Sequence, residues 1–227
     1  MTDPESQPSR PPRPTAGELS SAARRLYDEG PALFRRLQHY RPYICPFEEL
    51  IPLVPSGSRV LDVGCGGGLF LTLMADRIGL GDSIGFDANA TVIGLAQGAA
   101  QRAQLDTLEF RHLAVEEAWP EGEFDVVSII DVMHHVPPDA QRDVIKLCAQ
   151  HVKPGGILLY KDMCRRPLWR AWMNRLHDLV LARQWIHYAP VQDVVAWARI
   201  EGLTLERSTS MNRLWYGHEL RVFRKPA

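Results

Sequence analysis

A run of glycines directly after a short apolar segment is the strongest chemical signal in the sequence. Residues 60–63 are apolar apart from Asp62, and the positions that follow are rich in glycine, Gly64 and Gly66–Gly68. Glycines after a buried strand allow a tight turn and a close approach of the backbone to a ligand. Asp87 follows the next apolar run, where a carboxylate can accept hydrogen bonds from both hydroxyls of a ribose. Together these features predict a site for a nucleoside-containing cofactor.

The details of the glycine run distinguish between cofactors. The dinucleotide fingerprint requires glycine at its sixth position, which is Leu69 here, and no Gly-Lys-Ser or Gly-Lys-Thr of a phosphate-binding loop follows. Asp62 would repel a pyrophosphate, whereas its carboxylate suits a cofactor that carries an ammonium or sulfonium group. Two alternatives stay open, a nicotinamide-dependent oxidoreductase on a similar sheet and a non-catalytic module that only binds the cofactor.

Three residues that could move or hold a proton follow the strongest apolar run, 124–130. They are Asp131, His134 and His135. Histidine has an ordinary pKa of about 6.5, which suits it to accept a proton from a hydroxyl near neutral pH. Neighbouring residues in a turn point in different directions, so we expect at most one histidine to face an acceptor, and we favour His134. The alternative is that one histidine caps the next helix and Asp131 contacts the amino group of the cofactor.

Apolar runs and helical patterns alternate along the chain from residue 59. The runs predict strands at 59–63, 83–87, 108–113, 124–130 and 157–160. Strand, helix and strand at this spacing give right-handed crossovers and a parallel sheet. Two more strands, at 203–209 and 214–224, are separated by a short turn at 210–213 and should be antiparallel. The expected fold is α/β, with an open seven-stranded, mostly parallel Rossmann-like sheet, helices on both faces and one antiparallel strand near the edge.

The chain divides into three parts. Residues 1–20 contain five prolines among polar side chains and can bury almost no apolar surface, so we expect a disordered tail. Helical spacing of apolar residues over 21–57 predicts an N-terminal helical cap, divided at Gly30-Pro31 because glycine ends helices and proline begins them. We expect residues 58–227 to form the main domain, with variable lid or substrate helices at about 163–201.

Composition and charge exclude several classes of protein. The 26 Lys and Arg against 27 Asp and Glu give a net charge of -1, which argues against nucleic acid as a partner. The four cysteines lie far apart without a Cys-x-x-Cys pair, so neither a disulfide scaffold nor a structural zinc site is expected. The N-terminus has no apolar signal core and no apolar run is long enough to span a bilayer, so we expect a cytoplasmic protein.

The ordered set of segments resembles the class I S-adenosylmethionine-dependent methyltransferases of the small-molecule type. The resemblance extends from about residue 46 to residue 226, and the segments that carry it are 60–68 (VLDVGCGGG), 85–87 (GFD), 124–127 (FDVV), 131–137 (DVMHHVP) and 152–156 (VKPGG). It implies S-adenosylmethionine as the cofactor and methyl transfer to a small or lipid-like acceptor at a hydroxyl.

The same resemblance assigns roles around the cofactor. Asp62, Gly64 and Gly66 would hold its methionine part, and Asp87 its ribose. Family members often carry an acid at the end of the third strand, near the adenine, but in this sequence Ala114 stands there. The adenine is therefore expected near the backbone of Val115, or at Glu116.

Lys161 and Asp162 end the fifth predicted strand, where either could orient an acceptor or face solvent. Some catechol-type family members hold Mg²⁺ with acids at the ends of strands four and five and with an Asn that follows. Asp131 and Asp162 fit two of these places, but Met163 occupies the third. Because the set of oxygen ligands that Mg²⁺ prefers is incomplete, we expect no metal.

The segment 163–190 is where this family usually builds its specificity for the acceptor. Within it, residues 165–183 combine apolar side chains at helical spacing with five arginines and a single acid. Three interpretations stay open: a helix packed on the sheet, a lid over an apolar or aromatic acceptor, and docking on membrane headgroups or on an acyl-carrier protein. We expect a small-molecule or acyl-type acceptor and no nucleic acid, because no Asn-Pro-Pro-Tyr-like motif for handling a base is present.

Overall fold

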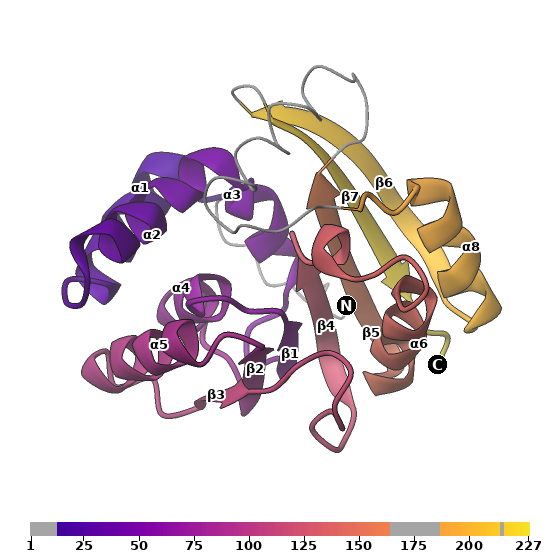
Figure 1. Cartoon of the computed structure of the whole chain (residues 1–227), viewed down its shortest axis with the longest axis horizontal. Helices are drawn as coiled ribbons and strands as arrows, with labels where there is room; N and C mark the ends of the chain where they lie inside the picture. Colours follow the sequence, from indigo (N-terminus) through magenta and orange to yellow (C-terminus); the bar gives the residue numbers. More distant parts are fainter. Residues whose placement is uncertain (1–12, 164–186, 214–215) are drawn as a thin grey trace, which may run out of the picture.

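A seven-stranded sheet lies at the centre of the computed structural model, which describes residues 13–163, 187–213 and 216–227 (Figure 1). Its strands are ordered β3-β2-β1-β4-β5-β7-β6. β1 to β5 are parallel, and β7 runs antiparallel to both β5 and β6. The strands are β1 (Val60–Val63), β2 (Ser83–Asp87), β3 (Leu108–His112), β4 (Phe124–Ile130), β5 (Val152–Met163), β6 (Thr204–Arg213) and β7 (Tyr216–Arg224). This arrangement confirms the predicted fold class.

Helices cover both faces of the sheet (Figure 1). On one face lie α4 (Leu69–Ile78), α5 (Ala90–Arg102) and the N-terminal helices, and on the other lie α6 (Gln141–His151) and α8 (Val191–Ile200). Successive strand residues supply opposite cores, as Val126 packs in the first core and Val127 in the second. A strand buried on both faces needs a nearly continuous apolar run, which is why these strands were visible in the sequence. None of the helices in the described ranges is long and apolar enough to cross a membrane.

The N-terminal cap consists of α1 (Ala16–Leu26), α2 (Ala32–Ile44), α3 (Phe47–Leu50) and the short helix η1 (Ile51–Leu53). The division between α1 and α2 at Gly30-Pro31 is confirmed, since Gly30 adopts a φ of 99° and α2 begins directly after Pro31.

The predicted disordered tail at 1–20 is wrong over 16–20, where the structure has the first turns of α1. Thr15 and Glu18 form a capping box that satisfies free backbone N–H groups at the start of the helix. Leu19 is fully buried in the first core. These contacts compensate for ordering a stretch whose composition is mostly polar, while residues 1–12 lie outside the described part of the chain.

The predicted turn at 210–213 is also wrong, because β6 continues to Arg213 and pairs with β7 through Ser210↔Glu219 and Arg213↔Tyr216. Exposed and half-buried side chains alternate to the end of β6, so the pleated strand simply runs on. β5 likewise begins at Val152, before the predicted start at Ile157. Of the lid or substrate helices predicted at about 163–201, the structure describes α8, and residues 164–186 lie outside the described ranges.

Candidate active site

The loop between β1 and α4 turns on glycines that no other residue could replace easily. Gly64, Gly66 and Gly68 adopt φ angles of 66°, 54° and 73°, in the left-handed region that favours glycine. A Cβ atom added to Gly64 would lie 2.4 Å from the Cγ2 atom of Val132, in the turn after β4. The glycine loop therefore presses against the carboxyl end of β4, beside the predicted proton-handling residues.

Asp62 sits at the base of this loop and is 3 % exposed. Its Oδ1 accepts a hydrogen bond from Ser128 Oγ at 2.6 Å. Burial raises the pKa of Asp62 to about 7, against the lowering effect of the Ser128 hydrogen bond, and the nearby charge of Asp87 raises it further. No ion pair to Asp62 is present among the described residues. A buried carboxylate of this kind is stabilised by a cationic ligand group, which fits the predicted ammonium or sulfonium.

Asp87 ends β2 and fastens the glycine loop to the start of α5. Its Oδ2 accepts from the backbone N–H of Gly66 at 2.9 Å, and its Oδ1 accepts from the N–H of Asn89, also at 2.9 Å. Each carboxylate oxygen can accept a second hydrogen bond, so the ribose hydroxyls predicted to bind there can be accommodated without breaking the loop.

The loop after β3 passes directly beside Asp87, since the N–H of Leu113 donates to the Asp87 carbonyl at 3.0 Å. Val115, predicted to lie near the adenine, follows in this loop, and its carbonyl accepts from Trp119 Nε1 at 3.0 Å. Glu116, the alternative contact, is exposed. The groups expected to hold the methionine part, the ribose and the adenine of the cofactor thus lie at or after the ends of three neighbouring strands, β1, β2 and β3.

The N-terminal cap contacts the glycine loop from outside. Tyr27 Oη donates to the carbonyl of Gly67 at 2.7 Å and lies 2.9 Å from Thr72 Oγ1. Phe34 and Gln38 of α2 lie so close to Gly67 that a Cβ there would be 2.6 Å and 2.7 Å from their side chains. The packing of the cap against this loop therefore requires glycine at position 67.

Asp131 stands between two cations at the end of β4, with a left-handed φ of 57°. Its Oδ1 lies 2.5 Å from Lys161 Nζ and its Oδ2 lies 2.8 Å from Arg41 Nη2. Burial raises the pKa of Asp131, but the charges of Lys161 and Arg41 outweigh burial and hold the pKa well below its usual range. Asp131 is therefore a fixed negative charge rather than a base, and its predicted contact with the cofactor stays a prediction.

The cation opposite Asp131 is not on the surface. Lys161 is 1 % exposed, so the alternative in which Lys161 or its neighbour Asp162 faces solvent is wrong. His218 of β7 is also buried nearby, and burial together with the charge of Lys161 lowers its pKa to about 3. His218 is accordingly neutral at physiological pH.

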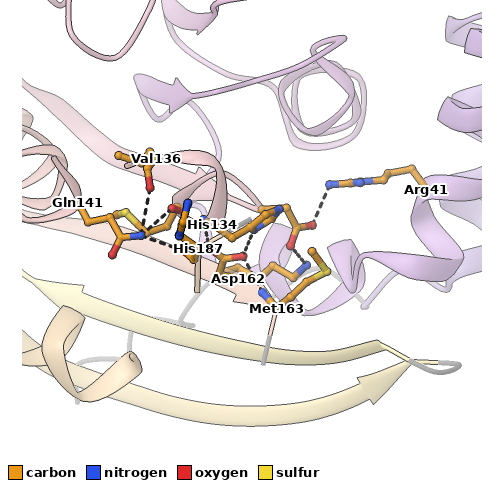
Figure 2. A network of polar contacts seen from close by, with 10 residues as sticks. Arg41, His134, Val136, Gln141, Asp162, Met163 and His187 are labelled. Atoms are coloured by element: carbon orange, nitrogen blue, oxygen red, sulfur yellow. Dashed lines mark hydrogen bonds and ion pairs between the residues drawn. The ribbon is translucent and has the colours of Figure 1, made fainter. Parts of the chain in front are cut away.

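His134 and Asp162 form a buried pair between the turn after β4 and the end of β5 (Figure 2). His134 Nδ1 lies 2.5 Å from Asp162 Oδ1, and the backbone N–H of His134 donates to Oδ2 at 3.1 Å. The N–H of Met163 adds a third hydrogen bond to Oδ1 at 2.7 Å. A carboxylate only accepts, so the ring donates from Nδ1, and in the neutral imidazole the lone pair then lies on Nε2. This is the tautomer that a general base requires.

His135 occupies a different environment although it is the next residue. Its side chain is exposed, while that of His134 is 2 % exposed, and the two ring centroids are 4.1 Å apart. Both belong to the short helix η2 (Met133–His135). The structure thus brings His134, Asp131 and Asp162 together and leaves His135 at the periphery.

Gln141 is a buried polar residue that no sequence motif indicates. From the first position of α6, its Nε2 donates to the carbonyls of Met133, Val136 and His187, at 3.3, 3.2 and 3.0 Å (Figure 2). The N–H of His187 in turn donates to the His134 carbonyl at 2.8 Å. Gln141 therefore joins the turn that carries His134 to the point where the described chain resumes.

The carboxylates proposed from the magnesium pattern are already engaged. Asp131 is paired with Lys161 and Arg41, and Asp162 accepts three hydrogen bonds. Met163 offers only a weak thioether ligand in the third place. Within the described ranges, no group of His, Cys, Asp and Glu side chains is arranged to hold a metal ion.

Comparison with known proteins gives a consistent set of relatives. A family model described as a methyltransferase domain matches residues 34–208. The chain is 38% identical over 114 residues to a ubiquinone biosynthesis O-methyltransferase of Acinetobacter baylyi, covering 49% of this chain and 46% of that protein. It is 35% identical over 177 residues to one of Xanthomonas axonopodis pv. citri, covering 70% and 68%. The chain spans about half the length of the first of these relatives.

Solved structures with the same fold include two proteins that are named as methyltransferases. An O-methyltransferase family protein from Burkholderia thailandensis superimposes with a TM-score of 0.66 at 23% identity, covering 94% of this chain and 64% of that one. Magnesium protoporphyrin IX methyltransferase from Synechocystis, solved with bound SAH, gives a TM-score of 0.66 at 18% identity, covering 92% and 95%. At these identities the likeness shows the fold alone.

Proposed function

The chain belongs to the methyltransferase-domain family, and on that premise we propose that it transfers a methyl group from S-adenosylmethionine to a hydroxyl of a small, lipid-like acceptor. Family and fold confirm the resemblance to class I S-adenosylmethionine-dependent methyltransferases drawn from the sequence. The observation that carries the proposed chemistry is the buried His134–Asp162 pair, because it holds an imidazole in the turn after β4, the same turn in which Val132 packs against Gly64.

The residues around the glycine loop fit the cofactor group by group. The Asp62 carboxylate suits the charged methionine end, Asp87 suits the ribose, and the backbone at Gly64, Gly66 and Val115 lies along the same edge of the sheet. S-adenosylmethionine, when bound, supplies an electrophilic methyl carbon on a sulfonium. The protein therefore needs chiefly to orient the acceptor, exclude water and remove a proton.

His134 would remove that proton. A hydroxyl becomes a stronger nucleophile as Nε2 of His134 accepts its proton, and the imidazolium that results is stabilised by Asp162 at Nδ1. Asp131 stays charged throughout and would fix Lys161 and Arg41 on the same rim. His135 is the weaker candidate, because its side chain is exposed, whereas the side chain of His134 is buried against Asp162.

The acceptor is proposed to be lipid-like because the relatives found are named for O-methylation in ubiquinone biosynthesis. The alternative of a nicotinamide-dependent oxidoreductase is wrong, since the family match is to a methyltransferase domain. Docking of a membrane or a carrier protein through 165–183 concerns residues outside the described ranges and stays a prediction.

Two measurements on the purified chain test this function. S-adenosylmethionine at 100 times its Kd should stabilise the fold by about 2.7 kcal/mol, visible as a thermal shift that NAD does not produce. Incubation with deuteromethyl-labelled cofactor and a hydroquinone or catechol bearing an apolar tail should yield an acceptor with the label on oxygen. Absence of any shift with the cofactor would overturn the cofactor assignment, and labelling at a ring carbon would overturn the hydroxyl.

A further inference from the structure

Helix α2 presents an apolar face that the rest of the described structure leaves uncovered. Of the five large hydrophobic side chains exposed in the described ranges, four lie on this helix: Leu33 at 66%, Leu37 at 48%, Tyr40 at 56% and Tyr43 at 42%. Spacings of four, three and three residues place them on one side of an α-helix. Contiguous apolar patches on a protein surface mark sites that contact another molecule.

The other side of α2 is committed to the site. Phe34 and Gln38 lie against Gly67, and Arg41 pairs with Asp131. Figure 1 shows α2 beside α1 at the outside of the molecule, away from α6 and α8. The uncovered face is therefore the outward side of the element that contacts the glycine loop, so anything docked on α2 lies beside the site.

The charge of α2 indicates what covers it. The whole chain has a net charge of -1, yet the helix contains Arg35, Arg36 and Arg41 and no acidic residue. Arg36 is exposed and lies among the four apolar side chains on the helix surface. The acids of the preceding turn, Asp28 and Glu29, each lie 3.5 Å from Arg102, which compensates one of their two negative charges.

Leucine, tyrosine and arginine on one helical face match the chemistry of a bilayer surface. Leucines enter the acyl boundary, tyrosines lie at the level of the headgroups, and arginine pairs with anionic phosphates. We propose that the outward face of α2 docks on an anionic lipid surface. A second copy of this chain is a poorer occupant, because two identical faces would bring Arg36 of each copy toward the other.

This docking does not depend on the proposed chemistry, and its test needs neither cofactor nor acceptor. The full chain is sedimented with vesicles of phosphatidylcholine alone and with vesicles that also contain phosphatidylglycerol. We expect binding to the anionic vesicles and at least tenfold weaker binding to the neutral ones, because basic residues near an anionic surface strengthen association.

Two variants and a matched control make the surface specific. The double substitution Leu37→Ser and Tyr40→Ser should weaken binding to the anionic vesicles about tenfold or more, through the lost burial of two large apolar side chains. Arg36→Glu should weaken anionic binding severalfold while leaving residual binding to neutral vesicles unchanged. Ile200→Ser removes the fifth exposed hydrophobic, 63% exposed on α8, and should change nothing. A thermal melt of each variant checks that it is folded.

Three results would overturn the proposal. The wild type could fail to sediment with either kind of vesicle, or the α2 variants could bind as well as the wild type. Alternatively, sedimentation equilibrium without lipid could show a dimer that Leu37→Ser and Tyr40→Ser dissociate, which would assign the face to a second copy.

Discussion

On the cofactor side of the site, the groups offered to a ligand are mostly backbone, and they come from one stretch of chain around Gly64 together with Asp87. On the acceptor side they are side chains from distant positions, with Asp162 lying 28 residues after His134 and the Gln141 contact spanning 46 residues. The first side needs a loop of a given conformation, and the second needs strands in the correct register. Substitutions on the two sides should therefore alter different steps, binding of the cofactor in one case and turnover in the other.

His134→Ala should show the largest difference between its effect on turnover and its effect on cofactor binding. Losing a general base should lower the maximal rate by roughly 10²–10⁴-fold. The affinity for S-adenosylmethionine should stay nearly unchanged, because His134 hydrogen-bonds to Asp162 and to the backbone of His187, which belong neither to the glycine loop nor to β2. Single-turnover rates across pH, with calorimetry of cofactor binding, measure both effects.

His135→Ala is the matched control, since its ring is exposed and is adjacent to the buried ring of His134. It should keep a rate close to the wild type. If both alanine variants keep near-normal rates at neutral pH, catalysis rests on positioning alone and the acceptor ionises without help from the protein.

Asp87→Ala should produce the opposite pattern. Lost hydrogen bonds to the ribose from a charged group should weaken cofactor binding by roughly 1.5–3 kcal/mol. The rate at saturating cofactor should change little, because Asp87 lies on the other side of the site from His134. Asp87→Asn, which can still accept at one oxygen, should fall between. Unchanged affinity in calorimetry of Asp87→Ala would remove the ribose assignment.

Asp62 should make cofactor binding depend on pH. Its pKa is raised to about 7, so below that pH the protonated acid offers no charge to an ammonium group. Affinity should fall by up to about tenfold per pH unit as the pH drops below 7. In Asp62→Asn the affinity should be weaker and flat across this range, and a wild-type affinity that is equally flat would contradict the role of Asp62.

The same group has the opposite effect on the free protein. The folded state holds the Asp62 proton more tightly than the unfolded state, whose pKa is near 3.8. Stability without cofactor should therefore fall as the pH rises from about 4 toward 7 through this group.

Gln141→Leu should have a smaller effect, and on the acceptor side only. The leucine cannot donate to the carbonyls of Met133, Val136 and His187. We expect a loss of about 1 kcal/mol, roughly fivefold in maximal rate, which is the usual worth of a neutral hydrogen bond. Gln150→Leu, exposed on the same helix, is the control. Equal losses in the two variants would mean that Gln141 acts through α6 stability and not through His134.

The smallest expected effect is none at all. EDTA should leave turnover intact, because Lys161, Arg41 and His134 already occupy the carboxylates of Asp131 and Asp162. Activity lost in EDTA and restored by Mg²⁺ would contradict this and would mean that these ion pairs open during turnover.

The two sides also differ in how much of them a sequence reveals. The glycine loop and the place of Asp87 at the end of β2 could be predicted because they depend on residue types at fixed short spacings. The strands β2 and β4 were predicted at their exact bounds, since double-sided burial leaves a continuous apolar run. His134 could be favoured over His135, but its acid partner depends on the pairing of β4 with β5, where Ile130 lies opposite Lys161.

Other features could not be predicted because composition and spacing do not report what packs against a segment. The polar stretch before Leu19 forms a helix through a cap and one buried leucine. Leu33 and Leu37 recur at helical spacing, as the residues of a buried helix face do, yet both side chains are exposed. Gln141 gave no signal because its partners are backbone carbonyls, which carry no sequence information.

The N-terminal cap is synthesised before the glycine loop and β4, which it contacts in the folded protein. Tyr27 bonds to Gly67, 40 residues later, and Arg41 bonds to Asp131, 90 residues later. A ribosome adds roughly 5–20 residues per second, so several seconds pass between the synthesis of α2 and the synthesis of its partner at the end of β4. Until then the side of α2 that contacts the glycine loop and Asp131 has no partner, so the helix acquires its packed side only after β4 has been made.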